Sequence, residues 1–130
     1  MADDLRPFEL GHARTDLRRK LVDAVLCGEK TATAGLRSDY APHTDEPLPA
    51  AGDRFALLDF EDRPVAVVET TEVRVVPAGE IDVEFARDEG EGFETIADWR
   101  RAHERFWAEY EIRDDTLIVA ECFRLVERLP

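Results

Sequence analysis

The segment 28–35 concentrates the side chains of this chain that are best suited to chemistry. It reads Gly-Glu-Lys-Thr-Ala-Thr-Ala-Gly, so Lys30 lies beside two hydroxyl groups, Thr31 and Thr33. The chain has 17 basic residues, and all except Lys20 and Lys30 are arginine. Arginine stays charged in proteins, whereas a buried lysine can lose its proton and act as a base or nucleophile. This pattern indicates a catalytic or binding role for Lys30; the alternative is an ordinary surface lysine after the end of a helix.

The charge of the chain is strongly acidic but unevenly distributed. A net charge of −13 argues against a general nucleic-acid binder, because such proteins take much of their affinity from lysine and arginine on phosphates. Residues 11–37 nevertheless hold six basic and three acidic side chains. We expect this region to suit a small substrate with one or a few anionic or polar groups. For Arg18 and Arg19 a solvated helix surface is the simpler interpretation.

The composition predicts one globular domain over residues 1–130, with 44% hydrophobic residues. No apolar run approaches the roughly 20 residues of a membrane-spanning helix, and residues 1–10 lack the apolar core of a signal peptide. We therefore expect a cytoplasmic protein without a membrane partner, with Cys27 and Cys122 as reduced core residues. The three histidines are scattered and no metal-ligand spacing occurs, so we expect neither a metal nor another cofactor.

The apolar periodicity predicts three helices and four strands. In chain order they are a helix over 15–27, a strand over 31–36, a loop over 37–52, strands over 54–60 and 65–76, helices over 79–88 and 95–110, and a strand over 116–126. Strands separated mostly by turns, with helices elsewhere, are typical of an α+β fold with a mainly antiparallel sheet, which we expect to be curled.

In their order and spacing these segments resemble an ASCH domain. The resemblance rests on Gly-x-Lys-Thr-x-Thr after a helix, Gly-Asp before a strand, Val-Glu-Thr-Thr-Glu-Val-Arg-Val-Val, Ala-x-x-Glu-Gly and Trp-x-x-x-His-x-x-Phe, and it covers residues 17–126. It implies a PUA-like β-barrel with flanking helices. Some small bacterial members of this family are amidohydrolases that remove the acetyl group from N4-acetylcytidine; others have been described as RNA-binding proteins or ribonucleases.

The resemblance to the amidohydrolases implies a catalytic lysine, threonine and glutamate. These match Lys30, Thr33 and Glu89, with Glu91 as the alternative carboxylate two residues on. The amidohydrolases continue after the threonine with an apolar residue and an arginine, whereas this chain has Ala-Gly, and Arg37 comes two residues later than the family pattern requires. These differences affect the expected substrate more than the expected chemistry.

The matched residues can perform amide hydrolysis. Thr33 supplies a hydroxyl nucleophile, and Lys30 acts either as its base or as a cation that polarises the carbonyl, a role favoured by its position just after a helix C-terminus. Glu89 acts as general acid and base, or it is only the salt-bridge partner of Lys30. Glu89 and Glu91 flank Gly90, so we expect their side chains to diverge and only one to reach Lys30.

The remaining expectations concern substrate binding and buried charge. We expect the substrate to contact Thr31, Arg37, Tyr40, Glu91 and His103. Trp99 and Trp107 are better explained as core residues than as surfaces for base stacking. Glu69 and Glu121 interrupt apolar strand faces, so we expect each to point into the barrel and pair with an arginine such as Arg74 or Arg124.

Two functions remain open from the sequence. The first is hydrolysis of a small N-acylated nucleoside-like substrate such as N4-acetylcytidine. The second is an ASCH domain that binds or cleaves single-stranded or modified RNA. The acidic composition outside residues 11–37 favours the first, and the oligomeric state is left open.

Overall fold

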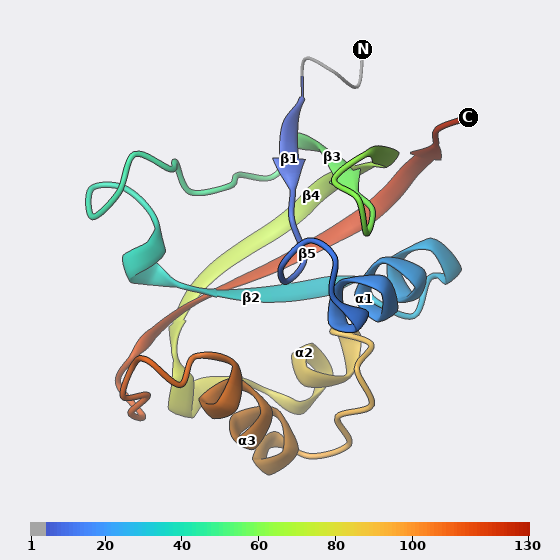
Figure 1. The fold of residues 1–130 in the computed structure, drawn as a ribbon. Helices are drawn as coiled ribbons and strands as arrows, with labels where there is room; N and C mark the ends of the chain where they lie inside the picture. Colours follow the sequence, from blue (N-terminus) through green and yellow to red (C-terminus); the bar gives the residue numbers. More distant parts are fainter. Residues whose placement is uncertain (1–4) are drawn as a thin grey trace.

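A curled five-stranded sheet organises the computed structural model, which describes residues 5–130 (Figure 1). The strands are β1 (Arg6–Phe8), β2 (Ala32–Leu36), β3 (Arg54–Leu58), β4 (Pro64–Pro77) and β5 (Leu117–Arg128). Their order in the sheet is β1-β3-β4-β5-β2, and only β1 runs parallel to its neighbour. The expected α+β fold with a mainly antiparallel curled sheet is confirmed, and β1 and β2 form its two edges.

Three helices accompany the sheet: α1 (Asp16–Cys27), α2 (Val83–Asp88) and α3 (Ile96–Phe106). The side chain of Thr15 caps α1, and Gly28 ends it in a left-handed conformation with φ of 87°. The single helix predicted over 79–88 is instead a 3-10 turn, Ala78–Glu80, followed by α2. The helix is interrupted because Asp82, between the two segments, has an extended backbone. Its carboxylate caps α2 by accepting a hydrogen bond from Phe85 N.

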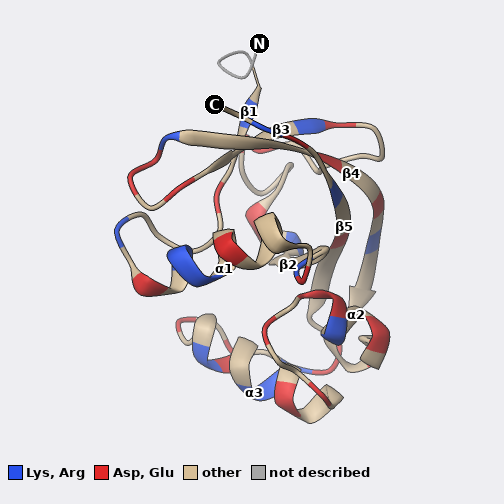
Figure 2. Ribbon diagram, turned by 90° about the vertical axis from the view of Figure 1, so that its right-hand side faces the viewer, with Lys and Arg blue, Asp and Glu red and all other residues tan. Residues whose placement is uncertain are grey.

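Two apolar cores lie on opposite faces of β5. Residues Leu21, Val22 and Val25 of α1 pack on one face with Phe123, and Figure 2 shows α1 within the curve of the sheet. On the other face, α2 and α3 pack around Trp99 against the β2–β5 pair. That second core consists of Ala32, Leu36, Ala78, Ile81, Phe85, Ala86, Trp99, Trp107, Ile112, Ile118 and Ala120. The tryptophans are core residues, as expected.

Strand alternation in β2 aims Thr33 away from the second core. Ala32 and Leu36 are members of that core, so the side chain of Thr33 points to the opposite, concave side of the sheet. In the antiparallel register Thr33 lies directly across from Glu121 of β5. The fold thus places a hydroxyl and a carboxyl group side by side on the inner face of the sheet.

Several expectations about local structure are wrong. Strand β1 was not predicted, because it has only three residues and its pairing with β3 is long-range. Cys27 is exposed rather than buried, since it occupies the last position of α1. The helix predicted over 95–110 ends at Phe106, and both Phe106 and Tyr110 are exposed. Among the described residues, no helix has the length and apolar character needed to cross a membrane.

Candidate functional site

Lys30 is buried, with 2% of its surface exposed, two residues before edge strand β2 begins. Its Nζ donates to the carbonyl oxygens of Ala32 (2.8 Å) and Glu89 (3.1 Å) and to Oε2 of Glu91 (3.4 Å). A second carboxylate oxygen, Oε1 of Glu89, lies 3.8 Å from Nζ. These acceptors suit an ammonium group, which has three hydrogens to donate and no lone pair. The geometry therefore matches the cationic role for Lys30 better than the role of a base.

Gly90 brings both glutamates to Lys30. Its φ is +68°, and a Cβ atom at this position would lie 2.4 Å from the carbonyl oxygen of Glu29 and 2.7 Å from the Cα of Lys30. Only glycine allows the two backbones to approach so closely. The expectation that one glutamate alone reaches Lys30 is wrong, because the turn at Gly90 sets both carboxylates within 4.0 Å of Nζ.

Helix α3 holds the other oxygen of Glu89. Trp99 Nε1 donates to Glu89 Oε2, and His103 Nε2 lies 3.4 Å from the same oxygen. His103 Nδ1 is 2.8 Å from the carbonyl oxygen of Trp99. A carbonyl only accepts, so Nδ1 carries a hydrogen and the Nε2 nitrogen faces Glu89. Glu89 is 1% exposed, and this imidazole is positioned to exchange a proton with it.

Two adjoining cavities open next to this cluster. The first, the Lys30 cavity, has a volume of about 380 Å³ and is lined by Glu9, Leu10, Gly11, Leu17, Leu21, Lys30, Thr33, Ala34, Glu89, Glu91, Phe93, Ala102, His103, Arg105 and Phe106. The second, the Glu121 cavity, has a volume of about 500 Å³ and is lined by Arg6, Pro7, Phe8, Glu9, Leu10, Thr33, Ala34, Gly35, Asp39, Tyr40, Glu46, Pro47, Pro49, Phe55 and Glu121. Thr33 lines both cavities and therefore lies where they meet.

A family model for the ASCH domain matches residues 9–127. The chain belongs to the ASCH domain family. A crystal structure of an ASCH domain from Lactobacillus crispatus JV V101 superposes with a TM-score of 0.81 at 26% identity, covering 94% of this chain and 79% of that one. A protein from Enterococcus faecalis V583, assigned to a domain family of unknown function, gives 0.82 at 28% identity, covering 95% and 77%.

A hypothetical protein with 17% identity and a TM-score of 0.59, which covers 85% of this chain and 94% of its own, shows the fold alone. No curated protein matches the sequence. The PUA-like fold expected from the resemblance is thus shown for this ASCH domain.

Of the residues expected at the site, most are brought together and two are not. Lys30, Thr33, Glu89, Glu91 and His103 line the Lys30 cavity, and Tyr40 lines the Glu121 cavity. Thr31 lines neither cavity and is exposed, with its hydroxyl near Asp88 O at 3.4 Å. Arg37 lines neither cavity and donates to Ala41 O at 2.9 Å, within its own loop.

The basic residues of segment 11–37 have different surroundings. Among the six, Lys30 lines a cavity, and the other five line neither of the two cavities. Arg18, expected on a solvated surface, is 1% exposed and is bonded to the carbonyl oxygens of Leu10, Gly11 and Asp59. The expectation for Arg18 is therefore wrong, and the expectation that this region suits a small anionic or polar substrate stays a prediction.

The two strand glutamates behave differently from each other. Glu69 accepts from Arg54 and Arg124 on the exposed side of the sheet. Glu121 points inward as expected, but its partner is a hydroxyl: Thr70 Oγ1 donates to its Oε2 at 2.7 Å. Burial raises the pKa of Glu121, while the Thr70 hydrogen bond and the charge of Arg6 oppose that shift.

Glu91 has the chemical properties of an accessible acid in this ASCH domain. Its side chain is 26% exposed toward the Lys30 cavity. Burial raises the pKa of Glu91, the Lys30 ammonium opposes the shift, and the nearby Glu89 carboxylate adds to it. A raised carboxyl pKa brings a group closer to the working range of a general acid.

Sequence reasoning missed the residues that β1 contributes. Arg6 lines the Glu121 cavity, and Glu9, just after β1, lines both cavities. No motif surrounds them, and their place depends on the long-range pairing of β1 with β3. Within residues 5–130, no group of three or more histidine, cysteine or acidic side chains is arranged to hold a metal ion.

Proposed function

We propose that this ASCH domain hydrolyses the amide bond of a small, uncharged N-acylated nucleoside, with N4-acetylcytidine as the first candidate. The observation that carries the proposal is the position of Thr33, which lines both cavities, next to the buried Lys30 and Glu89 and the more accessible Glu91. A nucleophile, an acid–base group and a cation are the parts that acyl transfer from an amide requires.

Each residue has one role in the proposed reaction. The Oγ atom of Thr33 forms a bond to the carbonyl carbon, and its proton passes to the carboxylate of Glu89. The C–N bond then breaks as that proton moves to the leaving nitrogen. Water attacks the acyl-threonine ester, which releases the carboxylic acid and restores the hydroxyl. Lys30 keeps both glutamates in place, and the His103 imidazole lets the buried Glu89 exchange protons.

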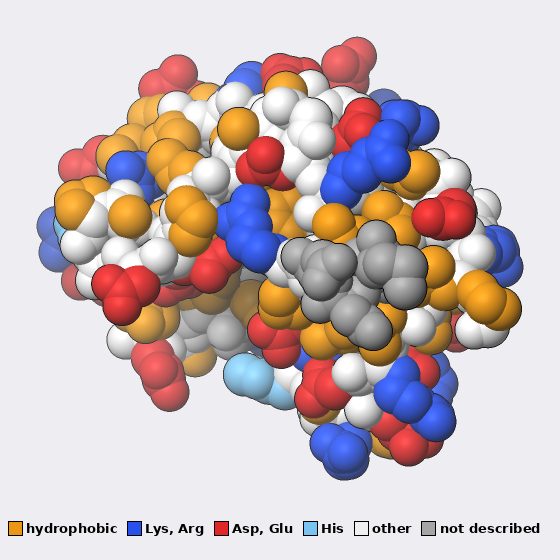
Figure 3. All heavy atoms as spheres, turned by 90° about the horizontal axis from the view of Figure 1, so that it is seen from above, with side chains coloured by type: hydrophobic (Ala, Val, Ile, Leu, Met, Phe, Trp, Pro, Cys, Tyr) orange, Lys and Arg blue, Asp and Glu red, His pale blue; other side chains and the backbone are white. Residues whose placement is uncertain are grey.

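The charges lining the cavities support an uncharged substrate. Three cations line them, Arg6, Lys30 and Arg105, against the six acidic residues Glu9, Asp39, Glu46, Glu89, Glu91 and Glu121. An excess of carboxylates repels phosphate. On the face seen in Figure 3, basic side chains are interspersed with acidic and apolar ones and form no continuous track. This distribution favours a free nucleoside over RNA.

A pair of threonine variants tests the proposal. Thr33→Val removes the hydroxyl at the junction, whereas Thr31→Val removes an exposed hydroxyl that lines neither cavity. With N4-acetylcytidine as substrate and release of cytidine as readout, we expect Thr33→Val to lose at least about 100-fold in turnover, the scale of a lost catalytic group, and Thr31→Val to match the parent. Equal activity of the two variants would remove Thr33 as the nucleophile.

The alternative, an RNA-binding domain, makes a different prediction. Phosphate contacts produce affinity that falls steeply as salt rises. Because the cleft carries more acidic than basic side chains, we expect single-stranded RNA to bind weakly and with strong salt dependence in a fluorescence titration. Tight binding of a long RNA that persists at physiological salt would favour the RNA-binding function instead.

A further inference from the structure

We propose that the Glu121 cavity is a subsite for an uncharged planar heterocycle with hydrogen-bond donors and acceptors on its edge, and that Glu121 accepts from one of the donors. The inference rests on the proposed function, because that function places the scissile amide at Thr33. It adds the place where the rest of the substrate binds and the residue that selects it.

The position of the cavity fits this role. Thr33 and Glu121 are directly opposed in the β2–β5 register, and both line the Glu121 cavity. Opposed side chains in an antiparallel pair have Cβ atoms about 4.5–5.5 Å apart. A ligand whose amide reaches Thr33 therefore extends naturally to Glu121, and about 500 Å³ accommodates a small ring system.

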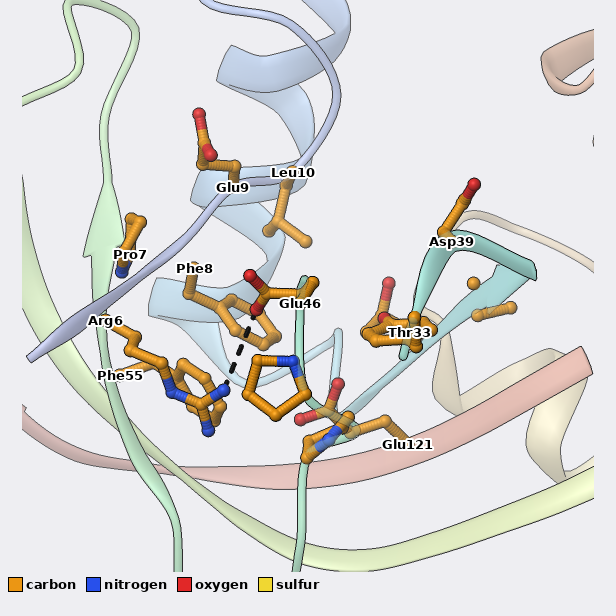
Figure 4. A pocket seen from close by; sticks show the side chains of 15 residues that line it. Arg6, Pro7, Phe8, Glu9, Leu10, Thr33, Asp39, Glu46, Phe55 and Glu121 are labelled. Carbon is orange, nitrogen blue, oxygen red and sulfur yellow. Dashed lines mark ion pairs between the residues drawn. The ribbon is translucent and has the colours of Figure 1, made fainter. Parts of the chain in front are cut away.

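Glu121 offers an acceptor to such a ligand. Its side chain is 5% exposed, and Figure 4 shows its carboxyl group rising from β5 into the cavity. Oε2 accepts from Thr70 Oγ1, whereas Oε1 has no hydrogen-bond donor among the described residues. Among these residues Oε1 is therefore free to accept a hydrogen bond from a donor on the edge of a ligand.

Two other residues that line the cavity, Arg6 and Tyr40, supply donors. Arg6 Nη2 donates to Asp53 at 3.0 Å, but Nη1 is buried, lies 3.7 Å from Glu46 Oε1 and has no hydrogen-bond partner among residues 5–130. Tyr40 lies against Gly35, where a Cβ atom would come within 3.0 Å of its hydroxyl oxygen. Burial, with the charges of Glu121, Asp39 and Glu46, raises the pKa of Tyr40 to about 12, so the hydroxyl keeps its proton.

Aromatic rings complete the cavity. Phe8 and Phe55 line it, with centroids 5.7 Å apart, and Figure 4 shows both beneath Arg6 and Glu46. Apolar ring faces with a few convergent polar groups are the usual composition of a site for a flat heterocycle. Phe8 also packs on Phe123, and the guanidinium of Arg6 lies 4.6 Å over the Phe55 ring, so the two rings form a rigid apolar wall beside the polar groups.

The test is binding of cytidine, which presents the heterocycle without an acyl group and needs no turnover. Isothermal titration compares the parent, Glu121→Gln and Glu127→Gln. The glutamine keeps an acceptor for Thr70 but turns a donor toward the ligand. Glu127 lies on the same strand, is exposed and lines neither cavity. Thermal midpoints verify that each variant is folded, and Tyr40→Phe provides a second variant, at another donor that lines the cavity.

We expect the parent and Glu127→Gln to bind cytidine with equal affinity. Glu121→Gln should bind it at least about tenfold more weakly, and Tyr40→Phe should also bind it more weakly than the parent. Ribose alone should not bind at the same concentrations. Any of three results overturns the subsite. These are a cytidine affinity of Glu121→Gln equal to that of the parent, ribose binding as tight as cytidine binding, and no binding of cytidine to the parent at millimolar concentration. Hydrolysis of N4-acetylcytidine is measured separately: its absence, with Glu121-dependent cytidine binding intact, overturns the proposed function and leaves the subsite standing.

Discussion

Arg18 and Lys30 are two buried cations from the same basic segment, and they are held in different ways. The guanidinium of Arg18 is bonded to three backbone carbonyl oxygens and to Asp62, and it lines neither cavity. Lys30 is surrounded by two backbone carbonyls and two carboxylates and lines a cavity. Burial alone therefore does not distinguish a structural cation from a functional one.

The partners make the difference. Backbone carbonyls fix Arg18 between the segment that follows β1 and the β3–β4 turn, so its bonds join parts of the fold. The glutamates around Lys30 are themselves titratable and face a cavity. Arg18 also pairs with the carboxylates of Asp62 and Glu9, but it lines neither cavity itself. Lys30 lines a cavity together with both of its carboxylate partners, which is the arrangement suited to chemistry.

Replacing Lys30 is expected to have the largest effect. Lys30→Arg keeps the positive charge, but the planar, bulkier guanidinium cannot reproduce three short contacts from one nitrogen. We expect hydrolysis of N4-acetylcytidine to be abolished while the far-ultraviolet circular dichroism spectrum is retained. Turnover within a fewfold of the parent would show that charge alone is sufficient at this position.

The two glutamates separate the roles within the Lys30 cluster. Removing a general acid–base group costs about 10²–10⁴-fold in rate, and we expect Glu89→Gln to fall in that range. The expectation that only one glutamate reaches Lys30 would have left Glu91→Gln with little effect. Because Glu91 also contacts Lys30, we now expect a loss of about tenfold, smaller than the acid–base range. Steady-state turnover of both variants checks the order, and a larger loss in Glu91→Gln would make Glu91 the acid–base group.

Much of this arrangement could be predicted from local sequence. The cap at Thr15, the stop at Gly28 and the alternation in β4 and β5 are short-range signals, and they placed α1 and the long strands to within about two residues of the structure. The Lys-Thr-x-Thr segment was recognised because all its residues are contiguous. Its position at the start of an edge strand follows from the same pattern.

The remainder depends on contacts between distant segments. Nothing near Gly90 indicates that its turn packs on the backbone of Glu29 and Lys30, which is what brings in both glutamates. Likewise, Arg18 has the spacing of a surface residue on α1, and it is buried by the segment that follows β1 together with the β3–β4 turn. Tertiary packing decides such cases, and periodicity cannot anticipate them.

Arg18 should affect stability more than activity. Arg18→Met leaves buried carbonyl oxygens without donors, and each such group costs about 1–3 kcal/mol. We expect a clear fall in the free energy of unfolding measured in urea, with turnover per folded molecule changed by less than about tenfold.

The neighbouring Arg19→Met is the control, because that side chain is 56% exposed and surface substitutions stay within about 0.5 kcal/mol. Equal unfolding curves for the two variants would mean that the carbonyl contacts of Arg18 contribute little to stability.

The smallest expected effect concerns Glu121, a buried acid whose hydrogen-bond partner is a hydroxyl rather than a cation. Burial raises its pKa above the ordinary value of 4.5, so the native state binds this proton more tightly than the unfolded state does. Stability of the parent therefore falls as pH rises from the unfolded value through the native one. Glu121→Gln removes this titration while keeping the acceptor for Thr70.

We therefore expect the difference in thermal midpoint, Glu121→Gln minus parent, to increase as the pH is raised from about 5 to about 8. Glu91, whose pKa burial also raises, is present in both proteins, so its contribution cancels in the difference. Glu127→Gln should give a difference that is flat with pH, because that side chain is exposed. A flat difference for Glu121→Gln would mean that the fold does not shift the pKa of this carboxyl group, and a difference that shrinks as pH rises would mean that its charged form is stabilised by its surroundings.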